Sequence, residues 1–307
     1  MSTPTGPAGL PVRMPRPRQP GRHRRPEPVV APDGAPALVL AVPGAPSTTA
    51  RTIAEDALSI ARSELPGLDA RIGYLEGEDS EGAEFPTLQG VLARTAAERT
   101  ARAELARASG SEVSEPEGPT AVVVPLLAGP DSDLLRRTRQ ALMDSQVVVE
   151  LADVLGPHPL LAEALHVRLS EAGLARADRA RLFTVATAAD GIILGTVGGQ
   201  EAVQAAGITG MLLAARLAVP VMAAALDQEG SVTSVAAQLR DAGSVQLALA
   251  PYVVGPEVSE GLLDTACKEA DCAAAEPLGD YSAIGKLAVA KYTEALGISP
   301  QPAPPGH

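Results

Sequence analysis

The feature that most constrains the fold of this chain is that its pattern of strands and helices occurs twice. From residue 37 onward, short apolar runs alternate with longer amphipathic runs, which is typical of a parallel sheet covered by helices. After residue 190 the pattern starts again: DGIILGTVGG resembles PALVLAVPGA, and VQLALAPYVVGP resembles TAVVVPLLAGP, with Pro251 in the place of Pro125. The repeat predicts two similar doubly wound α/β lobes, each with a parallel sheet of about four strands, and a ligand cleft at the carboxyl ends of the strands.

The repeat also sets the predicted organisation of the chain. We expect a disordered Pro/Arg-rich tail, two lobes and a short disordered end, at residues 1–35, 36–185, 186–298 and 299–307. In the first lobe the expected strands are 37–42, 70–77, 120–130 and 147–157, and the expected helices are 47–65, 86–108, 133–145 and 158–173. The first copy is longer than the second, and we expect its extra residues in the polar loops near 78–84 and 109–118.

Charge divides the chain into a basic tail and an acidic body. The net charge is −12, yet residues 1–36 carry six arginines and only two acidic residues. An acidic body argues against nucleic-acid binding. The tail is expected to be either a basic arm that contacts an acidic partner or a solvated extension.

Hydropathy and cysteine content point to the cytoplasm. Apolar residues make up 46% of the chain, but no run approaches the roughly 18 residues that a membrane-spanning helix needs. No apolar segment follows Arg24-Arg25, as an export signal requires. Cys267 and Cys272 are the only cysteines, and their spacing fits structural thiols in a reducing compartment better than a zinc or redox site. We therefore expect a cytoplasmic protein without a membrane segment.

Four short motifs occur in an order that one enzyme family shares. The first strand ends in the turn Pro43-Gly44, the second ends in Tyr74-Leu75-Glu76, the third reads AVVVPLL, and a later helix starts with LGPHP at 155–159. Together with the duplication, these motifs resemble the class II chelatases, the sirohydrochlorin cobalt- and ferrochelatases of cobalamin and siroheme biosynthesis. The resemblance implies a two-lobed lyase that inserts a divalent metal ion, Co²⁺ or Fe²⁺, as substrate into a tetrapyrrole such as sirohydrochlorin.

The histidine pair of that family is missing from this chain. Imidazole suits metal insertion because it is both a borderline ligand and a base near neutral pH. The resemblance places one family histidine at Pro43 and the other at Asp133, while the assisting glutamate is retained as Glu76. These three positions are the predicted catalytic residues, two of them as sites of lost histidines.

A carboxylate site remains as a hypothesis for metal binding. Glu76, Asp131, Asp133 and His158 could together ligate a cation. The alternatives are local: either aspartate caps the helix that follows it, and His158 caps the helix that begins at Pro159. His166 is expected to be solvated, and Arg136, Arg137 and Arg139 are candidates for binding ligand carboxylates. The residues predicted to contact the ligand at the strand-end turns are Gly44, Gly129, Gly198 and Asp227.

Three functional hypotheses follow from these observations. The chain is an atypical chelatase that relies on carboxylates, a non-catalytic carrier or sensor of a tetrapyrrole or metal, or a protein-interaction scaffold that uses its basic tail. A large acidic cleft would favour a metal-handling role. A cleft filled by Pro43 and its neighbours would favour the scaffold.

Overall fold

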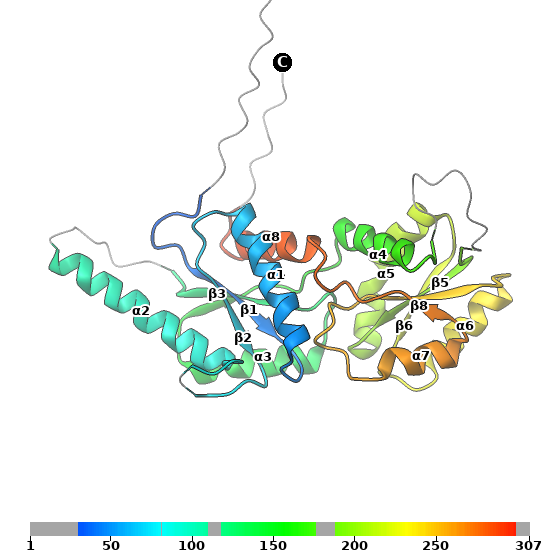
Figure 1. The fold of residues 1–307 in the computed structure, drawn as a ribbon, viewed down its shortest axis with the longest axis horizontal. Coiled ribbons are helices and arrows are strands. Elements are labelled where there is room, and N and C mark those ends of the chain that lie inside the picture. The colour runs from blue at the N-terminus through cyan, green and yellow to red at the C-terminus, as the bar shows by residue number, and fades with distance from the viewer. Residues whose placement is uncertain (1–29, 81, 110–117, 176–187, 299–307) are drawn as a thin grey trace, which may run out of the picture.

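Two four-stranded parallel sheets form the centre of the molecule (Figure 1). The computed structural model describes residues 30–80, 82–109, 118–175 and 188–298. The strand orders are β2-β1-β3-β4 and β6-β5-β7-β8. The predicted two-lobed doubly wound α/β fold is confirmed. The strands are β1 (Ala37–Val42), β2 (Ala70–Tyr74), β3 (Ala121–Pro125), β4 (Val149–Leu151), β5 (Gly191–Thr196), β6 (Val221–Ala225), β7 (Leu247–Pro251) and β8 (Ala273–Ala274).

The repeat seen in the sequence is a repeat of strand register. Pro125, the last residue of β3, lies opposite Ala41 of β1, and Pro251, the last residue of β7, lies opposite Gly195 of β5. Strands β1 and β5 are buried along their whole length, which explains why their sequences are unbroken apolar runs. The carboxyl ends of the strands therefore occupy equivalent positions in the two lobes.

Helices follow the strands as the amphipathic runs predict. Ser47 caps the first helix by accepting a hydrogen bond from the Ala50 N–H at 3.1 Å, and Thr87 caps the second in the same way. The helices are α1 (Thr48–Glu64), α2 (Leu88–Ala108), α3 (Ser132–Ser145), α4 (Pro159–Glu171), α5 (Gly199–Leu217), α6 (Ser231–Asp241), α7 (Leu262–Ala270) and α8 (Ala283–Ala295). Within the described ranges, no helix is long and apolar enough to cross a membrane.

Some details of the first lobe and tail differ from expectation. Strands β2 and β3 end at Tyr74 and Pro125, before the expected residues 77 and 130. Strand β4 covers only residues 149–151 of the expected 147–157, and the remainder leads irregularly toward the second lobe. The extra length of the first copy lies mainly where it was expected, in the segments 75–87 and 109–120, which have 13 and 12 residues where the second copy has five each. Helix α2 adds to it, with 21 residues where α6 has 11, and only the start of α2 is buried. At the end of the expected tail, Ala31 is buried and donates its N–H to the Pro66 carbonyl at 2.9 Å; residues 1–29 lie outside the described part.

The last helix of each half packs on the other half. Helix α4 follows β4 in the chain but packs against α5 and β7, whereas α8, at the end of the second half, packs against α1 and β3 (Figure 1). The chain thus crosses between the lobes twice on its way to completing them. The predicted domain boundary at residue 185 stays a prediction. Helices α4 and α8 each belong to one half by sequence but pack on the lobe formed by the other half.

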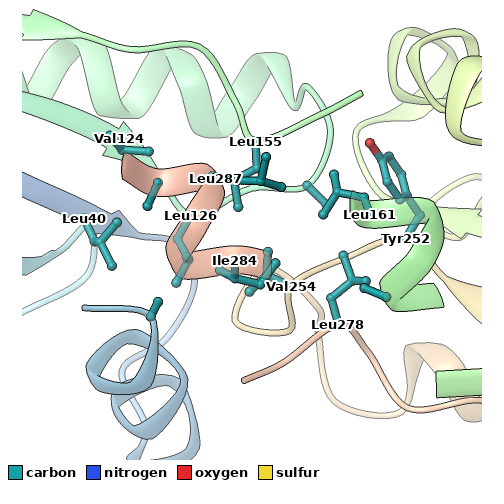
Figure 2. Close-up of a cluster of buried hydrophobic side chains, with 14 of the residues drawn as sticks. Leu40, Val124, Leu126, Leu155, Leu161, Tyr252, Val254, Leu278, Ile284 and Leu287 are labelled. Atoms are coloured by element: carbon teal, nitrogen blue, oxygen red, sulfur yellow. The ribbon is translucent and has the colours of Figure 1, made fainter. Parts of the chain in front are cut away.

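One apolar core runs through both lobes. Figure 2 shows Ile284 and Leu287 of α8 in the same buried cluster as Leu40 of β1, and Leu161 of α4 beside Tyr252, the residue after β7. All five side chains are at most 2% exposed. Removing such side chains from water contributes roughly 1.5–3 kcal/mol each, so this core holds the lobes together.

The contact between α1 and α8 depends on a glycine. Large aromatic residues are scarce, with two Phe, four Tyr and no Trp in the chain, so helices pack through small side chains. At Gly285 of α8, a Cβ would lie 2.5 Å from both the Ala57 carbonyl oxygen and the Ile60 Cβ of α1. Only a residue without a side chain allows α8 to approach α1 this closely.

We therefore expect Gly285→Ala to lower the free energy of unfolding by about 1–3 kcal/mol, because the added methyl group forces α8 away from α1. Gly207→Ala in α5 is the matched control: it is also inside a helix, and a Cβ there meets nothing within 4 Å. It should stabilise the protein by about 0.5–1 kcal/mol through helix propensity alone. Urea denaturation measures both, and equal effects would contradict the close packing of α1 and α8.

Candidate functional site

A cavity of about 880 Å³ lies between the lobes at the carboxyl ends of the strands. Its size is typical of small-molecule sites. The first lobe contributes the turn after β1, the start of α1 and Glu76, and the second contributes the loop 254–260 and residues 276–280. Arg168 of the exchanged helix α4 lies between them. The cavity lies where the doubly wound fold predicts a ligand.

The turns at the strand ends of the two lobes contact each other at two equivalent positions. A Cβ at Gly44, in the turn after β1, would collide with the Pro256 carbonyl of the second lobe. A Cβ at Gly198, in the turn after β5, would collide with the Pro130 carbonyl of the first lobe. Each glycine also has a positive φ, +74° and +102° respectively. Each position therefore needs glycine for two reasons: the turn has a positive φ, and the facing backbone leaves no room for a Cβ.

Glu76 is the predicted catalytic residue that lines the cavity. It follows Leu75, whose N–H is bonded to the Val42 carbonyl at the end of β1, so the side chain stands at the strand-end edge. Its carboxylate accepts a hydrogen bond from Arg137 of α3 at 2.9 Å, and about 40% of each side chain is exposed. A half-exposed ion pair of this kind contributes at most about 1 kcal/mol. Glu76 is thus held at the cleft and stays accessible.

The two aspartates have different local roles. Asp131 is the N-cap of α3 and accepts a hydrogen bond from the Leu134 N–H at 2.9 Å, which confirms the capping alternative for it. Asp133 lies in the first turn of α3, is 84% exposed and pairs with Arg136 at 3.0 Å. Neither lines the cavity, and neither Arg136 nor Arg137 does. Arg137 is instead bonded to Glu76.

The described histidines are not at the cavity. His158 is the N-cap of α4, where Nδ1 accepts a hydrogen bond from the Leu160 N–H at 3.1 Å, which confirms its capping alternative. Burial, with a smaller effect of Lys291, lowers the pKa of His158. His166, expected to be solvated, is instead 5% exposed, and its Nδ1 accepts a hydrogen bond from Arg216 at 2.7 Å. The expectation was wrong because α4 packs against α5 of the other half. This contact buries the face of α4 that carries His166.

Of the residues predicted to contact a ligand at the turns, Gly44 lines the cavity. Gly129 lies against the Tyr252 ring instead, 3.4 Å from where its Cβ would be. Asp227, the counterpart of Glu76, accepts hydrogen bonds from the N–H groups of Gly198 at 2.8 Å and Gly199 at 3.2 Å. The second-lobe carboxylate therefore stabilises the start of α5.

The predicted catalytic and metal-binding roles stay predictions, but the four proposed ligands do not form a cluster. Across the parts of the chain that the structure describes, no three His, Cys, Asp or Glu side chains come together to hold a metal ion. Pro43, the position of the first family histidine, is buried and does not line the cavity. The cavity itself is open, unlike the filled cleft that would favour a scaffold.

Several charged residues of the cavity were not predicted from the sequence, namely Arg168, Glu257, Glu260, Glu276 and Asp280. Glu257 is the most buried of these carboxylates. The residue lines the cavity, and its carboxylate accepts hydrogen bonds from the N–H groups of Val254 at 2.6 Å and Gly255 at 2.7 Å. Burial, with a smaller contribution from the charge of Asp131, raises the pKa of Glu257 to about 7 even though these bonds act in the opposite direction. The repeat could have identified it, since Gly255-Pro256-Glu257 matches Gly129-Pro130-Asp131.

Comparison with known proteins supports the fold. No protein-family model and no curated protein matches the sequence. Among solved structures, the chain is similar to the sirohydrochlorin chelatase SirB from Bacillus subtilis subspecies spizizenii in complex with cobalt, with 12% identity, a TM-score of 0.53, and coverage of 85% of this chain and 95% of that one. It is also similar to SirB from Bacillus subtilis with Fe³⁺, with 14% identity, a TM-score of 0.54 and the same coverage. The chain therefore has a chelatase-like fold.

Gly44→Ala should destabilise the protein more than Gly34→Ala. Both glycines have φ near +75 to +80°, but a Cβ at Gly34 meets nothing within 4 Å. Gly34→Ala should therefore cost only the strain of the positive φ, about 1–2 kcal/mol. Gly44→Ala should cost at least about 1 kcal/mol more, because the methyl group collides with the Pro256 carbonyl. Urea denaturation measures the difference, and equal losses would contradict the contact between the lobes.

Glu257 should make the protein less stable as the pH rises from about 4.5 to 7. Its folded pKa of about 7 lies above the ordinary 4.5, so in this window the native state keeps a proton that the unfolded state has lost. The free energy of unfolding of Glu257→Gln, minus that of the wild type, should thus grow by about 1–3 kcal/mol between pH 4.5 and 8. Denaturation at a series of pH values measures this. Exposed Glu229, substituted by Gln, is the control, and a flat difference for Glu257→Gln would contradict the burial of its charge.

Proposed function

We propose that the protein binds a tetrapyrrole such as sirohydrochlorin in the cavity between its lobes and handles a divalent metal ion, Co²⁺ or Fe²⁺, as a substrate there. The observation that carries the proposal is the open cavity of about 880 Å³ with Glu76 on its wall. The chelatase-like fold supports it, because SirB has the same two-lobed arrangement over nearly its whole length. The protein is then an atypical member of this group, since Pro43 and Asp133 replace its histidines.

Two carboxylates divide the chemistry under this proposal. Insertion of a metal ion displaces two pyrrole N–H protons, and a base with a pKa near the working pH accepts them best. Glu257 has such a pKa and lines the cavity. Glu76, exposed at the strand-end edge, is the oxygen ligand that meets the ion. Because the described residues offer no three-ligand cluster, the ring nitrogens must supply the remaining ligands.

A carrier or sensor is the second candidate. Loss of imidazole removes both a metal ligand and a base, which should slow insertion by orders of magnitude. The observation that favours this candidate is that Asp133, in place of the second histidine, pairs with Arg136 outside the cavity. In this case the cleft binds the ring, or the ring with its metal, without catalysis.

The scaffold hypothesis has less support. It expected Pro43 and its neighbours to fill the cleft, whereas Pro43 is buried below an open cavity. The basic tail and its acidic partner remain predictions, since most of the tail lies outside the described residues.

An anaerobic absorbance titration with sirohydrochlorin, followed by Co²⁺, tests the proposal. It should be run at about 0.5 M NaCl, where charges on the cavity wall are screened. Binding should shift the tetrapyrrole spectrum. Conversion to the cobalt spectrum faster than in buffer would support a chelatase, and a shift without acceleration would support a carrier. If the spectrum of sirohydrochlorin does not shift, the result contradicts the proposal that the protein binds sirohydrochlorin.

Glu76→Gln should reduce the rate of metallation, or the affinity for Co²⁺ in the ring-bound complex, by at least about tenfold, because the ligand charge is lost. Asp133→Asn is the matched control, since Asp133 is exposed and lies outside the cavity; it should change neither value by more than about twofold. Equal effects of the two substitutions would exclude a specific role for Glu76. Stability should change little in either variant, because both ion pairs are exposed.

A further inference from the structure

The wall of the cavity is acidic. Among the residues that the structure describes, five carboxylates line it against one arginine, Arg168. Arg168 is already bonded to Asp280 at 2.7 Å, to Glu171 at 3.1 Å and to the Leu278 carbonyl at 3.0 Å. Its charge is therefore already paired with two carboxylates of the protein, and its Nε, which forms no hydrogen bond, is buried.

The remaining carboxylates differ in how far they are neutralised. Glu76 has Arg137 as its partner. Glu257 bonds only to backbone N–H groups, and in the described part of the chain neither Glu260 nor Glu276 forms an ion pair. Glu260 and Glu276 are exposed and lie on the second-lobe side of the cavity. A ligand that carries many carboxylates would meet uncompensated negative charge there.

The hydrogen-bonding groups of the cavity need donors on the ligand. An ionised carboxylate accepts hydrogen bonds and donates none, so Glu260 and Glu276 cannot bond to carboxylates of a ligand. Ser47, Thr49 and Ser259 also line the cavity, and a hydroxyl both donates and accepts. The Ser47 hydroxyl already accepts from the Ala50 N–H and can still donate. A primary amide matches this set, because its NH₂ donates to the carboxylates and its carbonyl accepts from the hydroxyls.

Apolar groups complete the lining. Ile53 of α1 reaches across to the second lobe, where its Cδ1 lies 3.4 Å from the position of a Cβ on Gly255. Val258 and Pro277 lie on the opposite side of the same cavity. These side chains offer a surface for a flat, largely apolar ring.

From this lining we infer that the cavity selects a tetrapyrrole whose peripheral side chains are amides, and discriminates against the polycarboxylate form. The inference rests on the proposed function, because it names the ligand class of the same cavity. The ring packs on the apolar side chains, and amide N–H groups bind the acidic wall.

The affinities of sirohydrochlorin and of its fully amidated derivative test the inference directly, because the two ligands share one ring. Absorbance titrations at 0.05 and 0.5 M NaCl give both dissociation constants. At low salt the amide should bind about tenfold more tightly, since each unpaired carboxylate contributes roughly two- to fivefold. Raising the salt concentration should strengthen sirohydrochlorin binding and leave amide binding nearly unchanged, so the gap narrows.

A pair of double variants shows whether the wall itself is responsible. Glu260→Gln with Glu276→Gln removes two unpaired charges from the cavity, and should tighten sirohydrochlorin binding by at least about fourfold at low salt. Glu229→Gln with Glu269→Gln is the control. It changes the net charge equally, but both residues are exposed and neither lines the cavity, so sirohydrochlorin affinity should change by less than about twofold.

The outcomes separate this inference from the proposed function. If sirohydrochlorin binds at low salt as tightly as the amide or more tightly, the inference is wrong and tetrapyrrole binding stands. If both double variants have the same effect, the acidic wall does not select the ligand, and the inference is again wrong. If neither ligand binds at either salt concentration, the proposed function fails and the inference fails with it.

Discussion

The apolar core shared by the two lobes is the constraint on which the rest of the structure depends. Helices α4 and α8 each leave their own half and bury their apolar faces on the other. Leu161 thus lies beside Tyr252, and Ile284 joins the same core as Leu40 (Figure 2). This burial sets the distance between the two sheets. It thereby sets the width of the cavity, and it brings Gly44 against Pro256 and Gly198 against Pro130. The site is a consequence of how the lobes are joined.

The two copies of the repeat have kept their backbone and changed their side-chain chemistry. Glu76 and Asp227 occupy equivalent strand ends, yet the first is accessible at the cavity while the second stabilises a helix start. Asp131 and Glu257 follow equivalent Gly-Pro pairs, and there the relation is inverted: the first-lobe residue caps a helix and the second-lobe residue lines the cavity. In each of these matched pairs, one carboxylate lines the cavity and the other stabilises the start of a helix.

The sequence predicted the fold well because the information is local and repeated. Alternating apolar runs, Ser47 as a helix cap, and the matched Pro125 and Pro251 all have their structural meaning within a few residues of chain. The site was harder to predict because its walls come from segments about 200 residues apart. Glu76 was identified from its strand end, whereas Glu257 depends on how one loop meets the other lobe. His166 was misjudged for the same reason, since the helix that buries it comes from the other half.

The double crossing of the chain gives the molecule the topology of a domain-swapped dimer whose two subunits have been fused into one polypeptide. In such an arrangement a half cannot cover its own sheet, because one of the helices that covers it lies in the other half of the sequence. A cut between the repeats would leave each fragment with an uncovered apolar face and with a helix that has nothing to cover. Complementation between the fragments, and not independent folding, is then the way in which the cavity could be rebuilt.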